Sequence, residues 1–551
     1  MGVRSRSRSK RRRKATTLPS AAAAAGVDLI SDLSDDLLLR VLELLPDARD
    51  AVRTSALSRR WRPLWTRAAA LRFVDSNRRR EFREPGGLER FVSFVDHALA
   101  LRAAENEPAL EHLAISFDPS LSDDEEVSSD SKQLMRPSIE AAQGWIHHAM
   151  QHAVRSLNFE LILPWPSTEE DDNGGDDDNY SSSSGNPVMT LDDLVSSAKL
   201  ETMRLKLRAV NLHLPSAAAF ASLTDLSLEN MELEAGGGHL LARLVSSACC
   251  PHLHRLRLVG LGLPGMEEVP LLIDAGTLLE LSLLDVDDLV FVQLRTPSLR
   301  VLHVKGCYEL KGLTVSAPRL EDIKFLVQHP LHIDGDLSSV ARLKIDLCSS
   351  HGHEYLYVGI NDGSIRLLQC CRLIRCLEVS LQVDKRNQQD VDIIKGSIPR
   401  LPHVASLKIH VTLWERRCSD AAAGIASLLE ECSSIRYLSI NICYYRKNNR
   451  ELDHLLCDNS CPIWESHELS LPHLQVAEFE KLMGTDDELQ FIQFILKRAL
   501  EIQKVAFNFD RKSGKKAARM VSNLCLPPLA GGSWTTWTNE ANLSYNWRRC
   551  A

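Results

Sequence analysis

A short apolar pattern, Leu-x-x-Leu-x-Leu, recurs along most of this chain and constrains its fold more than any other feature. Six copies match it closely: Leu223-Leu226-Leu228, Leu253-Leu256-Leu258, Leu278-Leu281-Leu283, Leu299-Leu302-Val304, Leu320-Ile323-Phe325 and Val340-Leu343-Ile345. Six weaker copies are Leu200-Met203-Leu205, Ile374-Leu377-Val379, Val404-Leu407-Ile409, Ile435-Leu438-Ile440, Leu474-Ala477-Phe479 and Ile502-Val505-Phe507. One copy would be an ordinary strand, but so many in order indicate a repeat array.

The spacing of the copies indicates the class of repeat. From Leu200 to Val340, successive copies start 20 to 30 residues apart, close to the roughly 20 to 29 residues of a leucine-rich repeat. Each copy predicts one short strand whose apolar side chains enter a core shared with its neighbours. We therefore expect an α/β fold, a curved leucine-rich-repeat solenoid over residues 191–465, with irregular first strands at Leu113-Ile115-Phe117 and Leu157-Phe159-Leu161.

A small helical module is predicted ahead of the repeats, over residues 28–70. Ser34 is a suitable N-cap for a helix that opens with two aspartates and ends before Pro46. The apolar stripe of this helix consists of Leu38, Val41, Leu42 and Leu45. Two further amphipathic segments follow, one with Ala51, Val52 and Leu57 and one with Trp61, Leu64 and Trp65. Three short helices make too small a core to be stable alone, so we expect them to complete their burial against a partner or the next domain.

The module closely resembles the plant F-box. The matching elements are Leu29-Ile30, Leu33, Asp36-Leu37-Leu38, Leu45-Pro46, Ala51-Val52, Thr54-Ser55, Leu57-Ser58-Arg59-Arg60-Trp61 and Leu64-Trp65. The departure is Ser34, where the family usually has a Pro that lies at its partner surface. The resemblance implies that residues 28–67 bind a Skp-type adaptor of a cullin-based ubiquitin ligase. The alternative is a three-helix motif that packs only on the repeats.

The resemblance assigns the F-box fold and the adaptor contact jointly to nine residues. They are Leu33, Leu37, Leu38, Val41, Leu45, Pro46, Leu57, Trp61 and Trp65. Some must belong to the core and some to the interface, and the sequence alone does not divide them.

The last repeats carry a second resemblance. Residues 471–507 predict a strand, a helix that opens with Asp486-Asp487-Glu488 after Gly484, and a closing strand from Val505 to Phe507. The apolar face of this helix is Leu489, Ile492, Ile495 and Leu496. The segment is similar to the FBD region that follows the repeats in many plant F-box proteins, and it would also cap the array. We assign FBD-like terminal repeats to residues 466–510 and a C-terminal tail to residues 511–551.

Charge is distributed unevenly along the chain. The formal net charge is −8, yet residues 4–14 hold eight Lys and Arg side chains and no acidic one. In this basic tail, residues 1–27, the block Lys10, Arg11, Arg12, Arg13 and Lys14 is typical of a nuclear localisation signal. We therefore expect a protein of the nucleus, the cytoplasm or both; a solvated end and an organellar transit peptide are the alternatives.

Residues 71–190 predict irregular first repeats with acidic, disordered insertions at 121–132 and 167–185.

Residue patterns for catalysis, metals and cofactors are lacking. His148 and His152 are one helical turn apart, but no Glu follows His148 as a metalloprotease requires. Four potential ligands crowd into residues 249–254, which suits a tetrahedral zinc site badly. The sequence contains no P-loop motif, no Gly-x-Ser-x-Gly and no apolar run long enough to span a membrane. We expect no enzyme activity, no cofactor, no metal site and no membrane association.

The exposed position between the last two apolar residues of each copy predicts a recognition surface. This position is occupied by Arg204, Ser227, Arg257, Ser282, His303, Lys324, Lys344, Glu378, Lys408 and Ser439. Half of these are Lys or Arg, which predicts a basic stripe that binds an acidic or phosphorylated segment of a protein substrate. The candidate substrate-binding residues are Arg204, Arg257, His303, Lys324, Lys344 and Lys408. The plainer interpretation is a solvated sheet face with Lys and Arg for solubility.

Together, the two resemblances favour a substrate-recognition adaptor subunit of an SCF-type (Skp-cullin-F-box) E3 ubiquitin ligase, in which other subunits transfer ubiquitin. The alternative is a nuclear leucine-rich-repeat scaffold that binds protein or nucleic acid. Residues 1–17 contain no aromatic side chain that could stack on bases, so nucleic acid is the weaker expectation.

Overall fold

The strands predicted from the repeats form one long parallel sheet. The computed structural model describes residues 30, 32–74, 86–104, 109–118, 129–163, 186–191, 197–266, 268–327, 331–348, 361–383, 398–414, 418–445, 464, 467–510, 514–524, 529, 531–538 and 542–549. The successive parallel strands are β1 (Ala70–Val74), β2 (His112–Phe117), β3 (Ser156–Ile162), β5 (Thr202–Arg208), β7 (Asp225–Leu233), β8 (Arg255–Gly262), β10 (Glu280–Leu284), β12 (Val301–Lys305), β14 (Asp322–Leu326), β16 (Arg342–Cys348), β17 (Cys376–Val383), β18 (Ser406–Trp414), β19 (Tyr437–Tyr445), β20 (Val476–Leu482) and β21 (Lys504–Asp510). Each predicted copy coincides with one of the strands β5 to β21, and the two predicted earlier strands are β2 and β3.

Neighbouring strands align so that the same apolar position recurs from repeat to repeat. Leu226 pairs with Leu256, Leu256 with Leu281, and Leu281 with Leu302. Each of these side chains is at most 2% exposed. Burial of one leucine is worth about 1.5–3 kcal/mol, and a single repeat cannot bury its leucines without the repeats on either side. The predicted α/β solenoid is therefore one continuous core.

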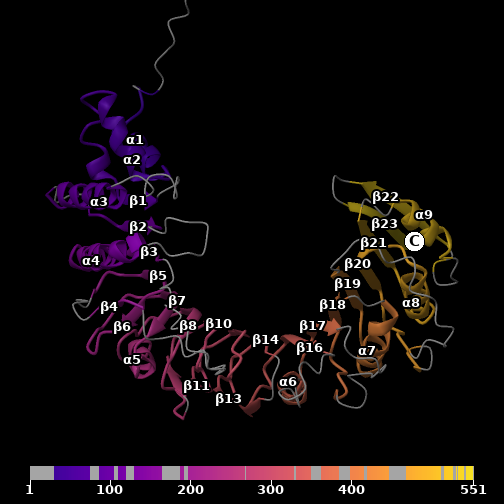
Figure 1. Ribbon diagram of the computed structural model, residues 1–551. Coiled ribbons are helices and arrows are strands. Elements are labelled where there is room, and N and C mark those ends of the chain that lie inside the picture. The colour runs from indigo at the N-terminus through magenta and orange to yellow at the C-terminus, as the bar shows by residue number, and fades with distance from the viewer. Residues whose placement is uncertain are drawn as a thin grey trace, which may run out of the picture.

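Two kinds of return segment connect the strands on the outer side of the arc (Figure 1). Helices fill the longer returns: α3 (Gly87–Ala104), α4 (Ser129–Gln151), α5 (Gly237–Leu244), α6 (Asp362–Cys370), α7 (Cys418–Glu431) and α8 (Asp486–Leu496). Short strands also occur in the returns: β4 (Val188–Thr190) and β6 (Asn211–His213), and then β9 (Leu271–Asp274), β11 (Phe291–Arg295), β13 (Gly312–Ser316) and β15 (His332–Gly335), which form a second, four-stranded sheet. This second sheet was not predicted. The copies beside it start only 20 to 25 residues apart, which leaves room for a short strand but not for a helix.

The repeats bend into an open arc (Figure 1). Helices α1 (Asp35–Glu43) and α2 (Ala48–Arg53) lie at one end, and the hairpin of β22 (Gly532–Thr538) and β23 (Asn542–Arg549) lies at the other. The main sheet follows the inner side, so one of its faces looks into the hollow of the arc.

The N-terminal module matches the prediction in its first two helices. Ser34 is the N-cap of α1, and its hydroxyl accepts from the Leu37 N–H at 3.5 Å. The predicted third helix is wrong. Residues 59–64 form turns, and the short 3₁₀ segments η1 (Thr54–Ala56) and η2 (Trp65–Arg67) lie on either side of them. Pro63 explains the difference, because it lacks an N–H and disfavours a helical conformation for the residue before it.

The C-terminal region confirms one prediction and corrects another. The expected strand, helix and strand are β20, α8 and β21, and Thr485 and Glu488 form a capping box at the start of α8. Residues 511–551, however, are not simply a tail: α9 (Gly514–Ser522) follows β21, and β23 pairs antiparallel with β21. Trp547 of β23 is completely buried, and the Trp534 ring stacks on Phe507 at 5.7 Å. These buried aromatics close the end of the core.

Several predicted segments lie outside the described residues. They include the basic tail with Lys10, Arg11, Arg12, Arg13 and Lys14, and the acidic insertion at 167–185. Of the other insertion, residues 121–128 also lie outside, whereas residues 129–132 are not disordered but form the first turn of α4. Ser and Asp are typical of a helix start as well as of a loop, which explains the misplaced boundary. Within the described ranges, no helix combines the length and the apolar character needed to cross a membrane.

Candidate docking and recognition surfaces

Helix α1 has two apolar faces, and only one of them is covered. Leu38 and Leu42 are 1% and 3% exposed and belong to the core. Leu37, Val41 and Leu44 are 53%, 46% and 68% exposed. These three follow the spacing i, i+4, i+7 and therefore lie along one side of the helix, which we call the α1 apolar face. Neighbouring aliphatic side chains left in water on one helix are typical of an interaction site.

The structure divides the nine predicted F-box residues into core and surface. Leu38 and Trp65 are buried, and Leu33, Leu45 and Trp61 are partly buried against the core. Leu37, Val41, Pro46 and Leu57 are exposed. Leu44 was not predicted, although its position seven residues after Leu37 is the helical spacing that would have found it. The exposed members are the ones available to a partner.

The other side of the module is fixed to the start of the repeats. The Arg72 guanidinium of β1 donates to the Glu43 carbonyl oxygen, and the Ala69 N–H donates to Glu43 Oε1 at 3.1 Å. The Arg49 guanidinium lies over the rings of Phe91 and Phe94 of α3, 5.4 and 5.6 Å from their centres. The module thus completes its burial against the next domain, one of the two predicted ways, and still leaves the α1 apolar face open.

The predicted recognition positions lie side by side in one row on the main sheet. Strand register joins them in the order Arg204, Ser227, Arg257, Ser282, His303, Lys324, Lys344, Glu378, Lys408 and Ser439. Their sequence neighbours on both sides are core residues, so these side chains point away from the core, towards the hollow of the arc. The alignment of the row is as predicted.

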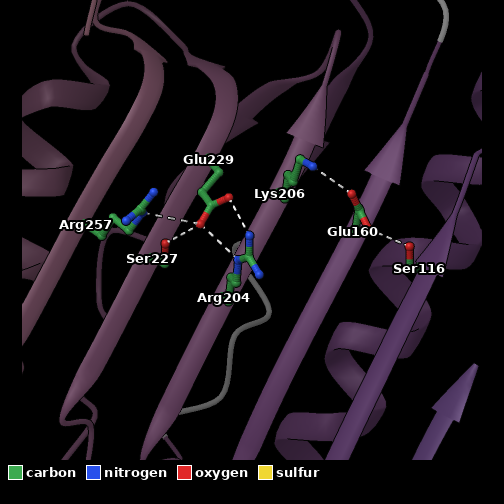
Figure 2. Close-up of polar contacts among 7 residues, drawn as sticks. All are labelled: Ser116, Glu160, Arg204, Lys206, Ser227, Glu229 and Arg257. Atoms are coloured by element: carbon green, nitrogen blue, oxygen red, sulfur yellow. Dashed lines mark hydrogen bonds and ion pairs between the residues drawn. The ribbon is translucent and has the colours of Figure 1, made fainter. Parts of the chain in front are cut away.

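The charge of the row differs from the prediction, because its first part is neutralised (Figure 2). Arg204 donates through Nε and Nη2 to the two carboxylate oxygens of Glu229 at 2.9 and 2.8 Å. Ser227 Oγ donates to Glu229 at 2.7 Å, and Arg257 Nε lies 3.8 Å away. Only 8% of the Glu229 side chain is exposed. Burial alone would raise the pKa of Glu229, but the hydrogen bonds from Arg204 and Ser227 and the charge of Arg257 lower it.

A second carboxylate neutralises the same region from the neighbouring row. Glu160 accepts from Lys206 Nζ at 2.8 Å and from Ser116 Oγ at 2.6 Å (Figure 2). Glu160 and Glu229 lie outside the predicted positions, and their ion pairs depend on the register of neighbouring strands, which was not predicted from the sequence.

The far part of the row is neutralised in a similar way. Lys344 forms an ion pair with Glu378, and His410 Nε2 lies 3.1 Å from the same carboxylate. Burial raises the pKa of Glu378, but the hydrogen bond and charge of Lys344 outweigh it and lower the pKa. Lys408 follows Glu378 in the row, and its charge also acts on Glu478. The continuous basic stripe is therefore wrong, and acidic partners interrupt it on both sides of the middle strands.

The middle of the row keeps its positive charge. Lys305 and Lys324 are exposed and form no ion pair with any other described residue. His303 lies opposite Lys324 in the neighbouring strand and two residues before Lys305 in its own, and its Nε2 is buried without a hydrogen-bond partner in the described part of the chain. The pKa of His303 is lowered, first by burial and then by the charges of Lys324, Lys305, Arg257 and Lys344. We call Arg257, His303, Lys305, Lys324 and Lys344 the central basic cluster.

Lys305 was missed because it lies one position beyond the residues read from each repeat. It is two residues after His303 in the same strand and therefore on the same face of the sheet. Side chains two residues apart in a strand point to the same face, and this rule applied to His303 would have found Lys305.

The residues considered for metal binding or catalysis do not assemble into a site. Among the described residues, no three His, Cys, Asp or Glu side chains are placed to share a metal ion. The rings of His148 and His152 lie 4.1 Å apart, and burial together with the neighbouring histidines lowers the pKa of His148 to about 4. Burial raises the pKa of Cys250 to about 12, so this thiol is not activated.

Comparison with known proteins supplies a relative for the whole chain. No family model matches it. An FBD-associated F-box protein of Arabidopsis thaliana is 24% identical over 514 residues, which cover 90% of this chain and the full length of the relative. The chain is a homologue of plant FBD-associated F-box proteins. A second such protein from Arabidopsis thaliana is 28% identical over 342 residues, 60% of this chain and 69% of the relative.

Another relative has leucine-rich repeats in its name. An F-box/FBD/LRR-repeat protein of Arabidopsis thaliana is 29% identical over 209 residues, 38% of this chain and 39% of the relative. The leucine-rich repeats in the name of this relative agree with the parallel solenoid of this chain.

Proposed function

We propose that this protein is the substrate-recognition subunit of an SCF-type E3 ubiquitin ligase. Its F-box module would bind a Skp-type adaptor, and its repeats would hold a protein substrate. The observation that carries the proposal is the α1 apolar face, which stays exposed although the opposite side of the same module is packed on β1 and α3. The homology to F-box proteins supports the assignment of this face to an adaptor.

The physical argument rests on the free energy of burial. Full burial of one Leu or Val side chain is worth about 1.5–3 kcal/mol. Leu37, Val41, Leu44 and Leu57 together offer a partner several such contributions from a surface already held rigid by its own core. An adaptor that covers these side chains removes them from water without any rearrangement of the module.

The proposed role is non-catalytic. The subunit would bring a substrate close to a charged ubiquitin carrier held by other subunits, and holding reactants together accelerates a reaction by raising their effective concentration. The arc suits this role, because the F-box module lies at one end and the inner face of the sheet remains open (Figure 1).

Co-purification with a matched pair of variants tests the proposal. Leu37 and Leu373 are both large exposed apolar residues, 53% and 51% exposed, but Leu373 lies before β17 and not on the module. We expect tagged Leu37→Asp to recover about tenfold less Skp-type adaptor and cullin than the wild type, and Leu373→Asp to recover normal amounts. Failure of the wild-type chain to recover the adaptor, or an equal loss in both variants, would contradict the proposal. Recovery of nucleic acid without adaptor would favour the scaffold instead.

A further inference from the structure

The central basic cluster contains two exposed cations, Lys305 and Lys324, between two stretches of the row that carboxylates partly neutralise. Arg204 is neutralised by Glu229 on one side, and Lys344 faces Glu378 on the other. Between these pairs, Lys305 and Lys324 form no ion pair with the residues that the structure describes. Four permanent cations act on the single imidazole of His303. Like charges held together in this way repel each other, so an anion placed among them removes an unfavourable interaction.

Besides Glu229 and Glu378, a third carboxylate, that of Asp346, lies close to the cluster. Asp346 interacts with Lys344 and Lys305. Burial raises the pKa of Asp346, and the hydrogen bond with Ser380 and the charges of Lys344 and Lys305 act in the opposite direction. The cluster remains net positive, because its four permanent cations outnumber the three carboxylates beside it, those of Glu229, Glu378 and Asp346.

Aliphatic side chains accompany the cations on the same face. Register places Leu284 beside Lys305 on one side and Leu326 on the other, and Val259 follows Leu284. All three are half-buried, so part of each side chain contacts solvent. The surface thus offers apolar contacts directly beside charged ones, which suits a ligand that carries both kinds of group.

We propose that the central basic cluster is the binding site for a short acidic peptide segment, in which Asp or Glu side chains are interspersed with aliphatic ones. Carboxylates of the segment would contact Lys305, Lys324 and the cations beside them, and its aliphatic side chains would pack on Leu284 and Leu326. The identification of this segment as part of a degradation substrate rests on the proposed ligase function. The binding site itself is inferred from the arrangement of the side chains and does not depend on that function.

The extent of the cluster sets the size of the segment. Arg257 lies on β8 and Lys344 on β16, four strand spacings apart through β10, β12 and β14. At roughly 4.8 Å per spacing the cluster spans about 19 Å, which an extended chain covers with about six residues at roughly 3.3 Å each. The carboxylates of Glu229 and Glu378 stand beyond the two ends.

The same features disfavour a nucleic acid. A polyanion longer than the cluster would meet Glu229 and Glu378. On the strands β8 to β16, the positions that face the hollow contain no Phe, Tyr or Trp on which bases could stack. A peptide with charges confined to a short stretch avoids both problems.

Fluorescence anisotropy with the full-length chain tests the proposal. The probe is a labelled peptide of about six residues in which glutamates alternate with leucines, matched to the spacing of the cluster. We expect Lys305→Glu with Lys324→Glu to weaken binding of this peptide at least about tenfold. The matched control is Arg295→Glu with Lys311→Glu, which makes the same change of charge at or beside β11 and β13 of the second sheet, on the outer side of the arc. This control should bind within about twofold of the wild type.

Three results would overturn the proposal: no saturable binding of the peptide by the wild type, an equal loss in both double variants, or tighter binding of a single-stranded oligonucleotide of equal charge. Adaptor co-purification distinguishes failure of the peptide-binding proposal from failure of the proposed ligase function. The Lys305→Glu, Lys324→Glu chain should recover the adaptor normally. Peptide binding without adaptor recovery would refute the ligase role alone.

Discussion

The α1 apolar face and the central basic cluster present opposite chemistry and are built in opposite ways. The α1 apolar face comes from one helix, and its three side chains are exposed because their neighbours Leu38 and Leu42 occupy the core. The cluster comes from strands spread over residues 257–344, and its charge depends on which carboxylates are near each cation. The α1 apolar face would bind a partner by removing apolar side chains from water, and the central basic cluster would bind one by attraction between opposite charges. Under the proposed function, the adaptor would bind the first surface and an acidic segment the second.

The largest expected effect is a difference in stability between substitutions on the buried side and on the exposed side of α1. Leu38→Ala removes a side chain that is 1% exposed, and we expect it to lower the free energy of unfolding of the module by about 2–5 kcal/mol. Leu37→Ala should cost less than about 0.5 kcal/mol, because its side chain is half in water. Hydrogen–deuterium exchange of the α1 amides measures both. Comparable protection in the two variants would mean that the assignment of the buried side is wrong.

An intermediate effect should appear where the row is neutralised. Glu229→Gln leaves Arg204 and Arg257 without the carboxylate that holds them. We expect a local loss of stability of about 1–3 kcal/mol, because the hydrogen bonds replaced are charge-assisted and partly buried.

The same variant should extend the basic cluster towards β5. Titration of the acidic peptide should then show binding a few-fold tighter than to the wild type. Unchanged or weaker binding by a chain that is still folded would show that the pairs do not limit the cluster.

The smallest effect concerns pH. The folded-state pKa of His303 lies below its ordinary value, because burial and the cations Lys324, Lys305, Arg257 and Lys344 disfavour the imidazolium. A bound carboxylate would raise this pKa, so binding would take up a proton and become a few-fold tighter as the pH falls from about 7.5 to about 6. His303→Gln should remove the dependence. The α1 apolar face contains no titratable side chain, so adaptor affinity should stay constant over the same range.

The sequence predicted features that depend on local periodicity. Every apolar repeat copy fell in a strand, and Ser34 capped the first helix as expected. Both follow from residues that are close in sequence, so neighbouring strands such as β8 and β10 did not need to be known in advance.

Predictions failed where distant residues decide the outcome. The charge of Arg204 depends on Glu229, 25 residues away, and this pairing requires the register of β5 and β7 to be known. Residues 532–549 carry no leucine-rich signature, yet Trp547 is buried because β21 offers an edge to pair with. The helix predicted around Trp61 failed for a local reason that was visible, namely Pro63.

The central claim is that the two surfaces act independently in one chain. Isothermal titration calorimetry of the full-length protein with a purified Skp-type adaptor tests it most directly. We predict saturable binding with a negative heat-capacity change, as expected when apolar area is buried. Binding should be lost in Leu37→Asp with Val41→Asp and unchanged in Lys305→Glu with Lys324→Glu. The account would be contradicted if the wild type bound no adaptor, or if the variant in the central basic cluster lost binding while the α1 variant retained it.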